Sequence, residues 1–453
     1  MSKSRSSSSS SRTGSNNAVN PRHLTVDIKQ ATTVRQLQQL VQRHGSSMDH
    51  IHLAATVNTL GNWQQRGKLS SSKQQVQQLL AGIEQLPRLQ QLLVQCRCWQ
   101  LSQLVWGLGL LGHTHTGLFG ACLNRFMQRQ HDIDRSQHVS VVLYGAAKAG
   151  WQIEPGQVQQ LLAALVRLLP GADPQAVANS LLAVATMGQT PTEQQLQQLL
   201  AALMRLLPDA HPRAVANSLW AAATMGGKVQ MQQLQLLLQH LTSRLADVNP
   251  QDVANSLWAV AKLAQKLTEQ QQQLQQLQNL QQLLASLASK LAAATPQAVA
   301  NSLWACAQLR VYPAELFAAL DSQQQWGRLL PAMTGQALAN TALACAVLGH
   351  RDERLPAGLL QHALQLQTSS DAQLDIQAVC NLCWSVAVLD LQQQAGSVVQ
   401  LVQAAASGQQ QFIAEDLRQL HQAAASGVAA GWSAGGWQGP GRGPDTAAAA
   451  AVQ

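Results

Sequence analysis

The stretch Val253-Ala254-Asn255-Ser256-Leu257-Trp258-Ala259-Val260-Ala261-Lys262-Leu263 recurs along the chain and decides its fold. Its core, Asn-Ser-Leu-Trp, stands also at 217–220 and at 301–304. Self-similarity at a period of this size is typical of repeat proteins, in which each repeat packs only on its neighbours. The sequence therefore predicts a repeat array that fills most of the chain.

The position of Asn255, called the mark from here on, gives the number of repeats. Counting starts from His52 as a divergent first mark, and the later marks are Gln103, Val141, Asn179, Asn217, Asn255, Asn301, Asn340 and Asn381. Ala, Leu and Gln dominate the chain, and these residues favour helices. We predict an all-α protein, an α-solenoid of about nine helix-pair repeats of roughly 38–46 residues.

Each repeat is predicted to hold two helices, because proline and glycine residues that end helices divide it in two. In one repeat a first helix runs over 193–207 and ends at Pro208, and a second runs from Pro212 to Gly226. Proline is favoured at a helix start and glycine just past its end. On a helical wheel of the second helix at the Asn255 mark, one apolar arc predicts the core; the other arc holds Gln251, Asp252, Asn255, Ala259 and Lys262.

Four regions follow from composition. Residues 1–26 contain no acid and many serines, which fits an organellar transit peptide; the alternative is a disordered tail. Residues 27–66 form a helical cap, and residues 67–391 form the array. Residues 392–453 read as a low-complexity tail rich in Ala, Gly, Gln and Ser, and residues 270–282 as a Gln-rich insertion.

Several function classes find no support in the sequence. No phosphate-binding loop, nucleophile elbow or His-Glu-x-x-His motif is present, so we expect no enzyme, no small-molecule substrate and no cofactor. Cys380 and Cys383 fall at helix positions filled elsewhere by Ala and Leu, which favours packing over a metal or redox site. No apolar run is long enough to cross a bilayer, so membrane insertion is not expected.

A ladder of cations recurs on the first helices. One Lys or Arg stands at an equivalent place before each of six successive marks, on the Gln-rich side of its helix; the six are Arg129, Arg167, Arg205, Arg244, Lys290 and Arg328. Cations at regular steps beside amides suit single-stranded RNA, whose phosphates follow charge while its bases meet polar side chains. The alternative is structural, because a cation in the last turn of a helix favours the helix dipole.

A second set of positions varies between otherwise matched repeats, seven residues after the mark. Its members are Lys148, Thr186, Thr224, Lys262 and Gln308. Residues that contact specific bases would vary in this way while the rest of the repeat stays the same. Random substitution of exposed residues explains the variation nearly as well. The mark asparagines either support neighbouring turns or contact a ligand, and Trp258 either packs between repeats or stacks on a base. We expect the second helices mainly to set the repeat spacing and the first helices to contact RNA.

The boxes Pro250-Gln251-Asp252-Val253-Ala254-Asn255-Ser256-Leu257-Trp258 and Pro296-Gln297-Ala298-Val299-Ala300-Asn301-Ser302-Leu303-Trp304 resemble the second helix of octotricopeptide repeats. The resemblance covers about residues 24–391. It implies an organellar RNA-binding protein, chloroplast or alternatively mitochondrial, that stabilises, processes or helps translate particular transcripts, together with other RNA-processing proteins. The competing hypothesis is an α-solenoid scaffold for protein partners without RNA contact, since one fold serves both uses.

Overall fold

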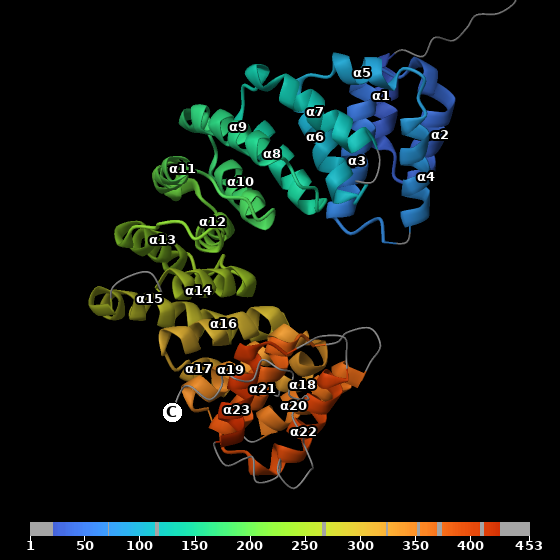
Figure 1. Ribbon diagram of the computed structural model, residues 1–453. Coiled ribbons are helices and arrows are strands. Elements are labelled where there is room, and N and C mark those ends of the chain that lie inside the picture. The colour runs from blue at the N-terminus through green and yellow to red at the C-terminus, as the bar shows by residue number, and fades with distance from the viewer. Residues whose placement is uncertain are drawn as a thin grey trace, which may run out of the picture. The chain divides into compact units, whose positions relative to one another are not determined.

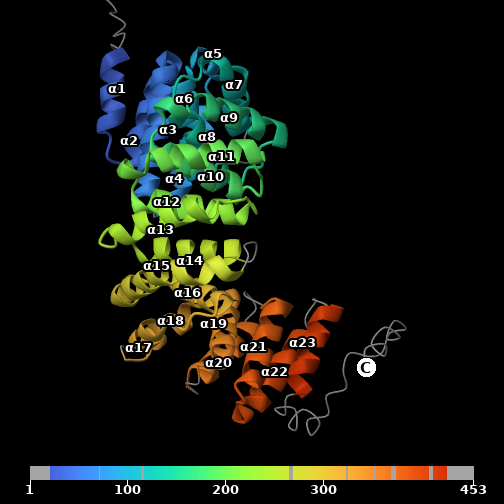
Figure 2. The ribbon, with the colours of Figure 1, turned by 90° about the vertical axis from the view of Figure 1, so that its left-hand side faces the viewer.

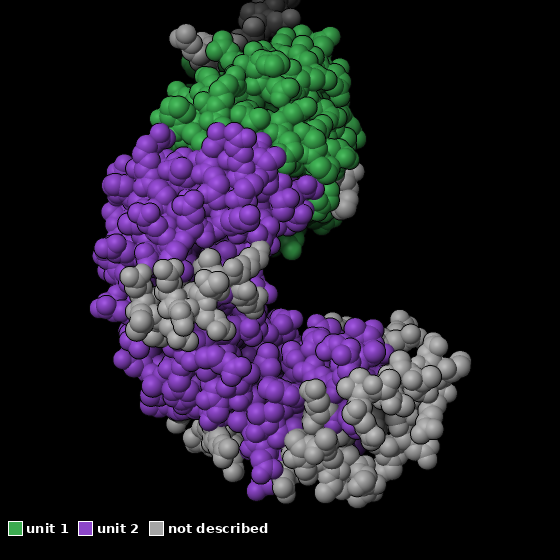
Figure 3. Space-filling view, turned by 60° about the vertical axis from the view of Figure 1, so that its left-hand side comes forward, with its two compact units in different colours: residues 1–172 green, residues 173–453 purple. Residues whose placement is uncertain are grey.

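The computed structural model describes residues 21–70, 72–113, 117–264, 269–322, 325–350, 354–368, 374–407 and 412–425. Within these ranges the chain forms α-helices and short 3-10 helices and no strand. The predicted all-α fold is confirmed: successive helix pairs stack in two layers, as in an α-solenoid. The chain divides into two compact units, residues 1–172 and 173–453, which Figure 3 colours separately.

In the first unit, the second helices of the repeats pack side by side in one layer (Figure 1). They are α1 (Pro21–Gln30), α3 (His50–Gln65), α6 (Cys98–Leu110) and α8 (Ser136–Lys148). The first helices cover one side of this layer. They are α2 (Val34–His44), α4 (Lys73–Glu84), α5 (Leu89–Gln95), α7 (Gly117–Gln128) and α9 (Pro155–Arg167).

The second unit repeats this arrangement, as Figure 2 shows for its stacked helices. Its second helices are α10 (Pro174–Thr186), α12 (Pro212–Thr224), α14 (Pro250–Ala264), α16 (Pro296–Leu309), α19 (Gly335–Leu348), α21 (Ile376–Val388) and α23 (Ala414–Ala425). Its first helices are α11 (Glu193–Arg205), α13 (Met231–Ser243), α15 (Glu269–Ser289), α17 (Ala314–Ser322), α18 (Gln325–Leu329), α20 (Arg354–Thr368) and α22 (Ala395–Ala406). The Gln-rich insertion belongs to α15, which has 21 residues against 13 in α13.

Neighbouring second helices approach one another closely at the position four residues after the mark. A Cβ atom added to Gly145 of α8 would lie 2.7 Å from the backbone Cα of Trp106 on α6, so only glycine fits there. The equivalent Ala259 is fully buried. The helical wheel predicts Ala259 and Asp252 on the polar arc, and for both residues this is wrong, because α14 packs on both α12 and α16. A narrow exposed strip remains, formed by the mark and the positions four before, three after and seven after it.

The helices begin and end at the predicted proline and glycine residues. Pro174 and Pro296 occupy the first turns of α10 and α16, and the side chains of Asp173 and Thr295 cap those helices by accepting backbone N–H bonds. Past the end of α10, Gly188 has φ +67°, a left-handed conformation that favours glycine. At the same place after α16, Arg310 takes φ +56°.

Two predicted boundaries need correction. Helix α1 begins at Pro21, inside the predicted leader, of which residues 1–20 lie outside the described residues. The predicted tail from residue 392 contributes a further helix pair, α22 and α23, because its apolar residues keep the repeat spacing and are buried. Gln419 stands at the mark of this pair and donates to Asn381.

One predicted register is also wrong, because in α3 the mark is Ala55 and not His52. Thr56 is buried and its hydroxyl donates to the carbonyl of His52, as Ser256 donates to the carbonyl of Asp252. His52 thus occupies the place of Asp252, three residues before the mark. Residues in this terminal repeat diverge, so one polar residue was not enough to set the register.

All seven cysteines are free and buried. Burial raises the pKa of Cys96, Cys306 and Cys380 to about 12, so almost no thiolate forms at neutral pH. We expect a thiol reagent at pH 8 to label the native protein far more slowly than it labels free cysteine, and to label seven thiols after denaturation. Rapid labelling of one or two native thiols would contradict this packing role.

Candidate nucleic-acid interface

The predicted cation ladder engages backbone carbonyls of the preceding repeat. The Nη1 atom of Arg129 donates to the carbonyl of Cys96 (2.6 Å), and Nη2 of Arg167 donates to that of Ile133 (3.1 Å). Nη1 of Arg244 reaches the carbonyl of Ala210 (3.0 Å). Arg328 bonds the carbonyls of Ala294 (3.0 Å) and Leu291 (2.8 Å), and Arg205 ends α11 at the equivalent place.

Lys290 is the most strongly engaged member of this ladder. Its Nζ donates to the carbonyls of Leu245 (2.5 Å), Ala246 (3.2 Å) and Val248 (2.6 Å), in the turn between α13 and α14. Carbonyls past a helix end lack a partner within the helix, and a cation satisfies several of them at once. Five members of the ladder therefore tie their repeat to the one before it; they are Arg129, Arg167, Arg244, Lys290 and Arg328. Contact of all six residues of the ladder with RNA stays a prediction.

The exposed strip of the second helices carries a repeated amide pair. In five helices of the second unit, the glutamine four residues before the mark donates its Nε2 to the Oδ1 of the mark asparagine, at 2.6 to 3.0 Å; the pairs are Gln175 with Asn179, Gln251 with Asn255, Gln297 with Asn301, Gln336 with Asn340 and Gln377 with Asn381. The bond fixes both amides. It uses neither the glutamine oxygen nor the asparagine Nδ2, so these atoms can accept from and donate to a ligand.

Partly exposed tryptophans follow three residues after the mark. The ring centroids of Trp220 and Trp258 lie 6.2 Å apart, and those of Trp258 and Trp304 lie 6.3 Å apart, with interplanar angles of 35° and 30°. The three rings form a continuous row across α12, α14 and α16. We call these rings the tryptophan row. The predicted packing of Trp258 between repeats agrees with this row, which also keeps part of each ring exposed.

Three of the predicted variable positions, Thr224, Lys262 and Gln308, stand on the helices of the tryptophan row, four residues after the rings. The Nζ of Lys262 lies 5.7 Å from the ring centroid of Trp258 and 5.1 Å from that of Trp304, within reach of a cation–π interaction with each. Thr186, Thr224 and Gln308 are exposed at the equivalent ends of α10, α12 and α16. In the first unit, Lys148 lies 5.6 Å from the ring of Tyr144 on its own helix.

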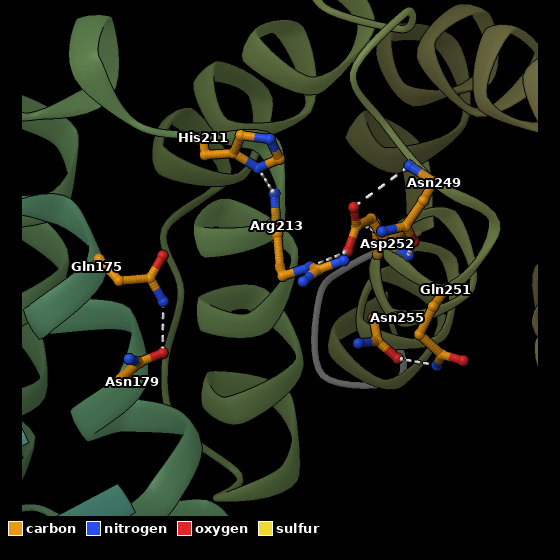
Figure 4. A network of polar contacts seen from close by, with 9 residues as sticks. Gln175, Asn179, His211, Arg213, Asn249, Gln251, Asp252 and Asn255 are labelled. Atoms are coloured by element: carbon orange, nitrogen blue, oxygen red, sulfur yellow. Dashed lines mark hydrogen bonds and ion pairs between the residues drawn. The ribbon is translucent and has the colours of Figure 1, made fainter. Parts of the chain in front are cut away.

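One repeat departs from the amide pair. Helix α12 has Arg213 where its neighbours have glutamine, and Figure 4 shows its side chain extending toward Asp252 on α14. The Nε of Arg213 lies 3.8 Å from Oδ1 of Asp252, whose side chain is buried. Burial raises the pKa of Asp252, while the backbone N–H of Asn249 and the charge of Arg213 act against this rise. The sequence pattern did not predict this contact, although Pro-Arg in place of Pro-Gln was visible.

The exposed charged residues on this surface are cations. Among the residues of α10, α12, α14, α16, α19 and α21, Asp252 is the one acid, and its side chain is 2% exposed. Arg213 is 61% exposed, and Lys262 is partly exposed. The surface combines amides, indole rings and cations without an exposed carboxylate on these helices, which favours an anionic ligand with aromatic groups.

Comparison with known proteins points to the same part of the chain. Residues 136–270 match one protein-family model. That model describes the Tbc2 translation factor, N-terminal domain. The stretch similar to Tbc2 runs from α8 into α15 and so includes Arg213, Asp252 and two rings of the tryptophan row.

No curated protein matches the chain. Among solved structures, one similar chain belongs to a homology model of the full-length AP-3 complex in an intermediate open conformation, with 10% identity, a TM-score of 0.32, and coverage of 90% of this chain and 83% of that chain. A TM-score of 0.32 carries no functional information. In the part of the chain that the structure describes, no helix is both long and apolar enough to span a bilayer.

Proposed function

We propose that this protein binds single-stranded RNA along the exposed strip of its second helices and acts in translation. The observation that carries the proposal is the regular alternation of amide pairs and indole rings on a surface without an exposed acid on α10, α12, α14, α16, α19 and α21. Fixed amides suit base edges, and partly exposed rings offer stacking surfaces to unpaired bases. The similarity of residues 136–270 to a translation factor domain supports the second half of the proposal.

The proposal shifts the expected contact from the first helices to the second. The first-helix cations use their nitrogens on carbonyl oxygens inside the protein, whereas Lys262 and the amides face outward. The variable residues Thr186, Thr224, Lys262 and Gln308 lie beside the bases in this arrangement. They are the positions at which one repeat would favour one base over another.

Fluorescence anisotropy tests RNA binding directly. The full chain is titrated into labelled single-stranded RNA of mixed sequence and into the matching duplex, between about 50 and 200 mM salt. We expect tighter binding of the single strand. The logarithm of its association constant should fall linearly with the logarithm of salt concentration, with a slope of about −0.7 per phosphate contacted. Equal affinity for the duplex, or no binding at the lowest salt, would contradict the proposal.

Membership of the octotricopeptide repeat family and an organellar location, chloroplast or alternatively mitochondrion, belong to the same proposal. The repeat spacing and the Asn-Ser-Leu boxes support the family, and the location is what this resemblance implies. The proposal includes binding without a catalytic step or cofactor, in company with other organellar RNA-processing proteins. Imaging of the tagged full chain tests the location, and sequencing of RNA crosslinked to it names the transcript.

One feature favours a protein partner at the last repeats. In α19 and α21 the position seven residues after the mark is apolar, Val347 and Val388, and Val388 is 43% exposed. A scaffold function predicts partners that stay bound after nuclease treatment and in high salt, and that are lost when Val388 is replaced by a charged residue. RNA binding predicts the loss of partners on nuclease treatment.

A further inference from the structure

Helix α12 differs from its neighbours in the hydrogen-bonding groups that it exposes. In α10, α14, α16, α19 and α21 the Oδ1 of the mark asparagine is occupied by a glutamine. In α12 the residue at the glutamine position is Arg213, and its side chain turns toward the next repeat (Figure 4). Within the described residues the side chain of Asn217 makes no hydrogen bond, so both its oxygen and its nitrogen are available.

The guanidinium of Arg213 faces the carboxylate of Asp252 with its Nε. Its Nε faces Oδ1 of Asp252 at 3.8 Å, and Asp252 is fixed in turn, because its Oδ2 accepts from the backbone N–H of Asn249 (3.3 Å) and its own N–H donates to Asn249 Oδ1 (2.9 Å). The backbone N–H of Arg213 donates to Nδ1 of His211 (3.2 Å). The two terminal nitrogens of Arg213 bond none of the described residues, and the side chain is 61% exposed. The guanidinium thus presents a planar fork of two terminal donors to solvent, with its Nε side toward Asp252.

Guanine is the base that matches this arrangement. Its O6 and N7 are two adjacent acceptors, and arginine binds them with both terminal nitrogens. Adenine places an amino donor beside its N7, which would oppose the guanidinium, and uracil has an N–H between its two carbonyl oxygens. Unpaired cytosine also has two adjacent acceptors, N3 and O2, so enrichment of guanine over cytosine is part of the expected result. The free Oδ1 of Asn217 can accept from an N–H on the other edge of an unpaired guanine. A glutamine in place of Arg213 would present one donor and one acceptor and would not distinguish guanine in this way.

We propose that Arg213, oriented by Asp252 and flanked by Asn217, selects guanine at one position of the bound RNA. This inference rests on the proposed RNA-binding function. Phosphate also accepts a bidentate arginine, but a phosphate contact carries no sequence information, so the two contacts differ in what they do to base preference.

Selection from a random pool of single-stranded RNA tests the inference with the full chain and with Arg213→Gln. This variant restores the glutamine found in five other helices, so it is expected to fold. The parent should enrich RNAs with guanine at one position, and the variant should lose that preference while keeping the rest of the consensus. The affinity of the variant for the best parental RNA should fall about 5-fold to 150-fold, the range for a bidentate base contact.

Three further comparisons sharpen the result. Replacing that guanine by 7-deazaguanine removes N7, and it should weaken binding by the parent but not by Arg213→Gln. Arg418→Gln removes one similarly exposed arginine of α23 and should keep the parental consensus. Asp252→Asn keeps the arginine and should weaken the guanine preference by loosening its orientation.

The outcomes separate the two proposals. If the parent enriches no RNA, the proposed function fails. If the parent binds RNA and Arg213→Gln selects the same guanine, the inference fails while the function stands. A loss in Arg213→Gln that is equal for all RNAs, with a salt dependence lower by about one phosphate contact, would show a phosphate contact and would also overturn guanine selection.

Discussion

Replacing Lys290 by methionine is expected to lower the free energy of local opening around the turn between α13 and α14 by about 2 kcal/mol. The ammonium group donates to three carbonyls in that turn, and methionine fills a similar volume without a donor. Hydrogen bonds to a charged group contribute roughly 1.5–3 kcal/mol, and the partial exposure of Lys290 lets water replace some of that. Native-state hydrogen exchange of residues 245–248 measures the change.

The control for this experiment is Lys228→Met, which removes the same charge from an exposed residue with no hydrogen-bond partner for its ammonium among the described residues. Exchange at 245–248 should rise about 30-fold in Lys290→Met, which corresponds to about 2 kcal/mol, and should not change in Lys228→Met. RNA affinity should fall equally and slightly in both. If Lys290→Met leaves exchange unchanged but abolishes RNA binding, the cation ladder contacts RNA and the structural role is wrong.

Replacing Trp258 by leucine is expected to weaken single-stranded RNA binding by about 10-fold or more. Trp258 is the middle ring of the tryptophan row, with neighbours at 6.2 and 6.3 Å. Stacking of one base on an aromatic ring contributes about 1–3 kcal/mol. Leucine keeps an apolar side chain between the repeats but removes the ring, so the loss reports stacking more than packing. Fluorescence anisotropy at fixed salt gives the affinity.

Two further variants separate stacking from a change in fold. Trp258→Phe keeps a ring and should retain most of the affinity, so a difference between the Phe and Leu variants reports the loss of stacking. Leu236→Ala removes an exposed apolar residue of α13, in the first-helix layer, and should bind RNA as the parent does. Equal affinities of the Leu and Phe variants would argue against a base on this ring.

Much of the fold was predictable because it depends on local signals. The regular spacing of the marks, proline at the starts of second helices and glycine after their ends all act within one repeat, and the structure has helices at these places. The last helix pair, α22 and α23, was missed because Ala- and Gln-rich composition hid the few apolar residues, such as Val398 and Leu401, that bury it. His52 was misplaced because a single polar residue was matched without the buried Thr56 beside it.

The candidate site depended on contacts between repeats, which a linear pattern does not contain. The sequence by itself determined the all-α repeat architecture, most positions of the marks and the existence of one cation per first helix, because these follow from helix periodicity and composition. Only the tertiary structure decided that those cations bond carbonyls of the preceding repeat, that Asp252 is buried beside Arg213, and that the tryptophans form a row. The physical reason is that stacking brings equivalent positions of successive repeats together. The distances between repeats then determine which polar groups form hydrogen bonds within the protein and which remain for a ligand.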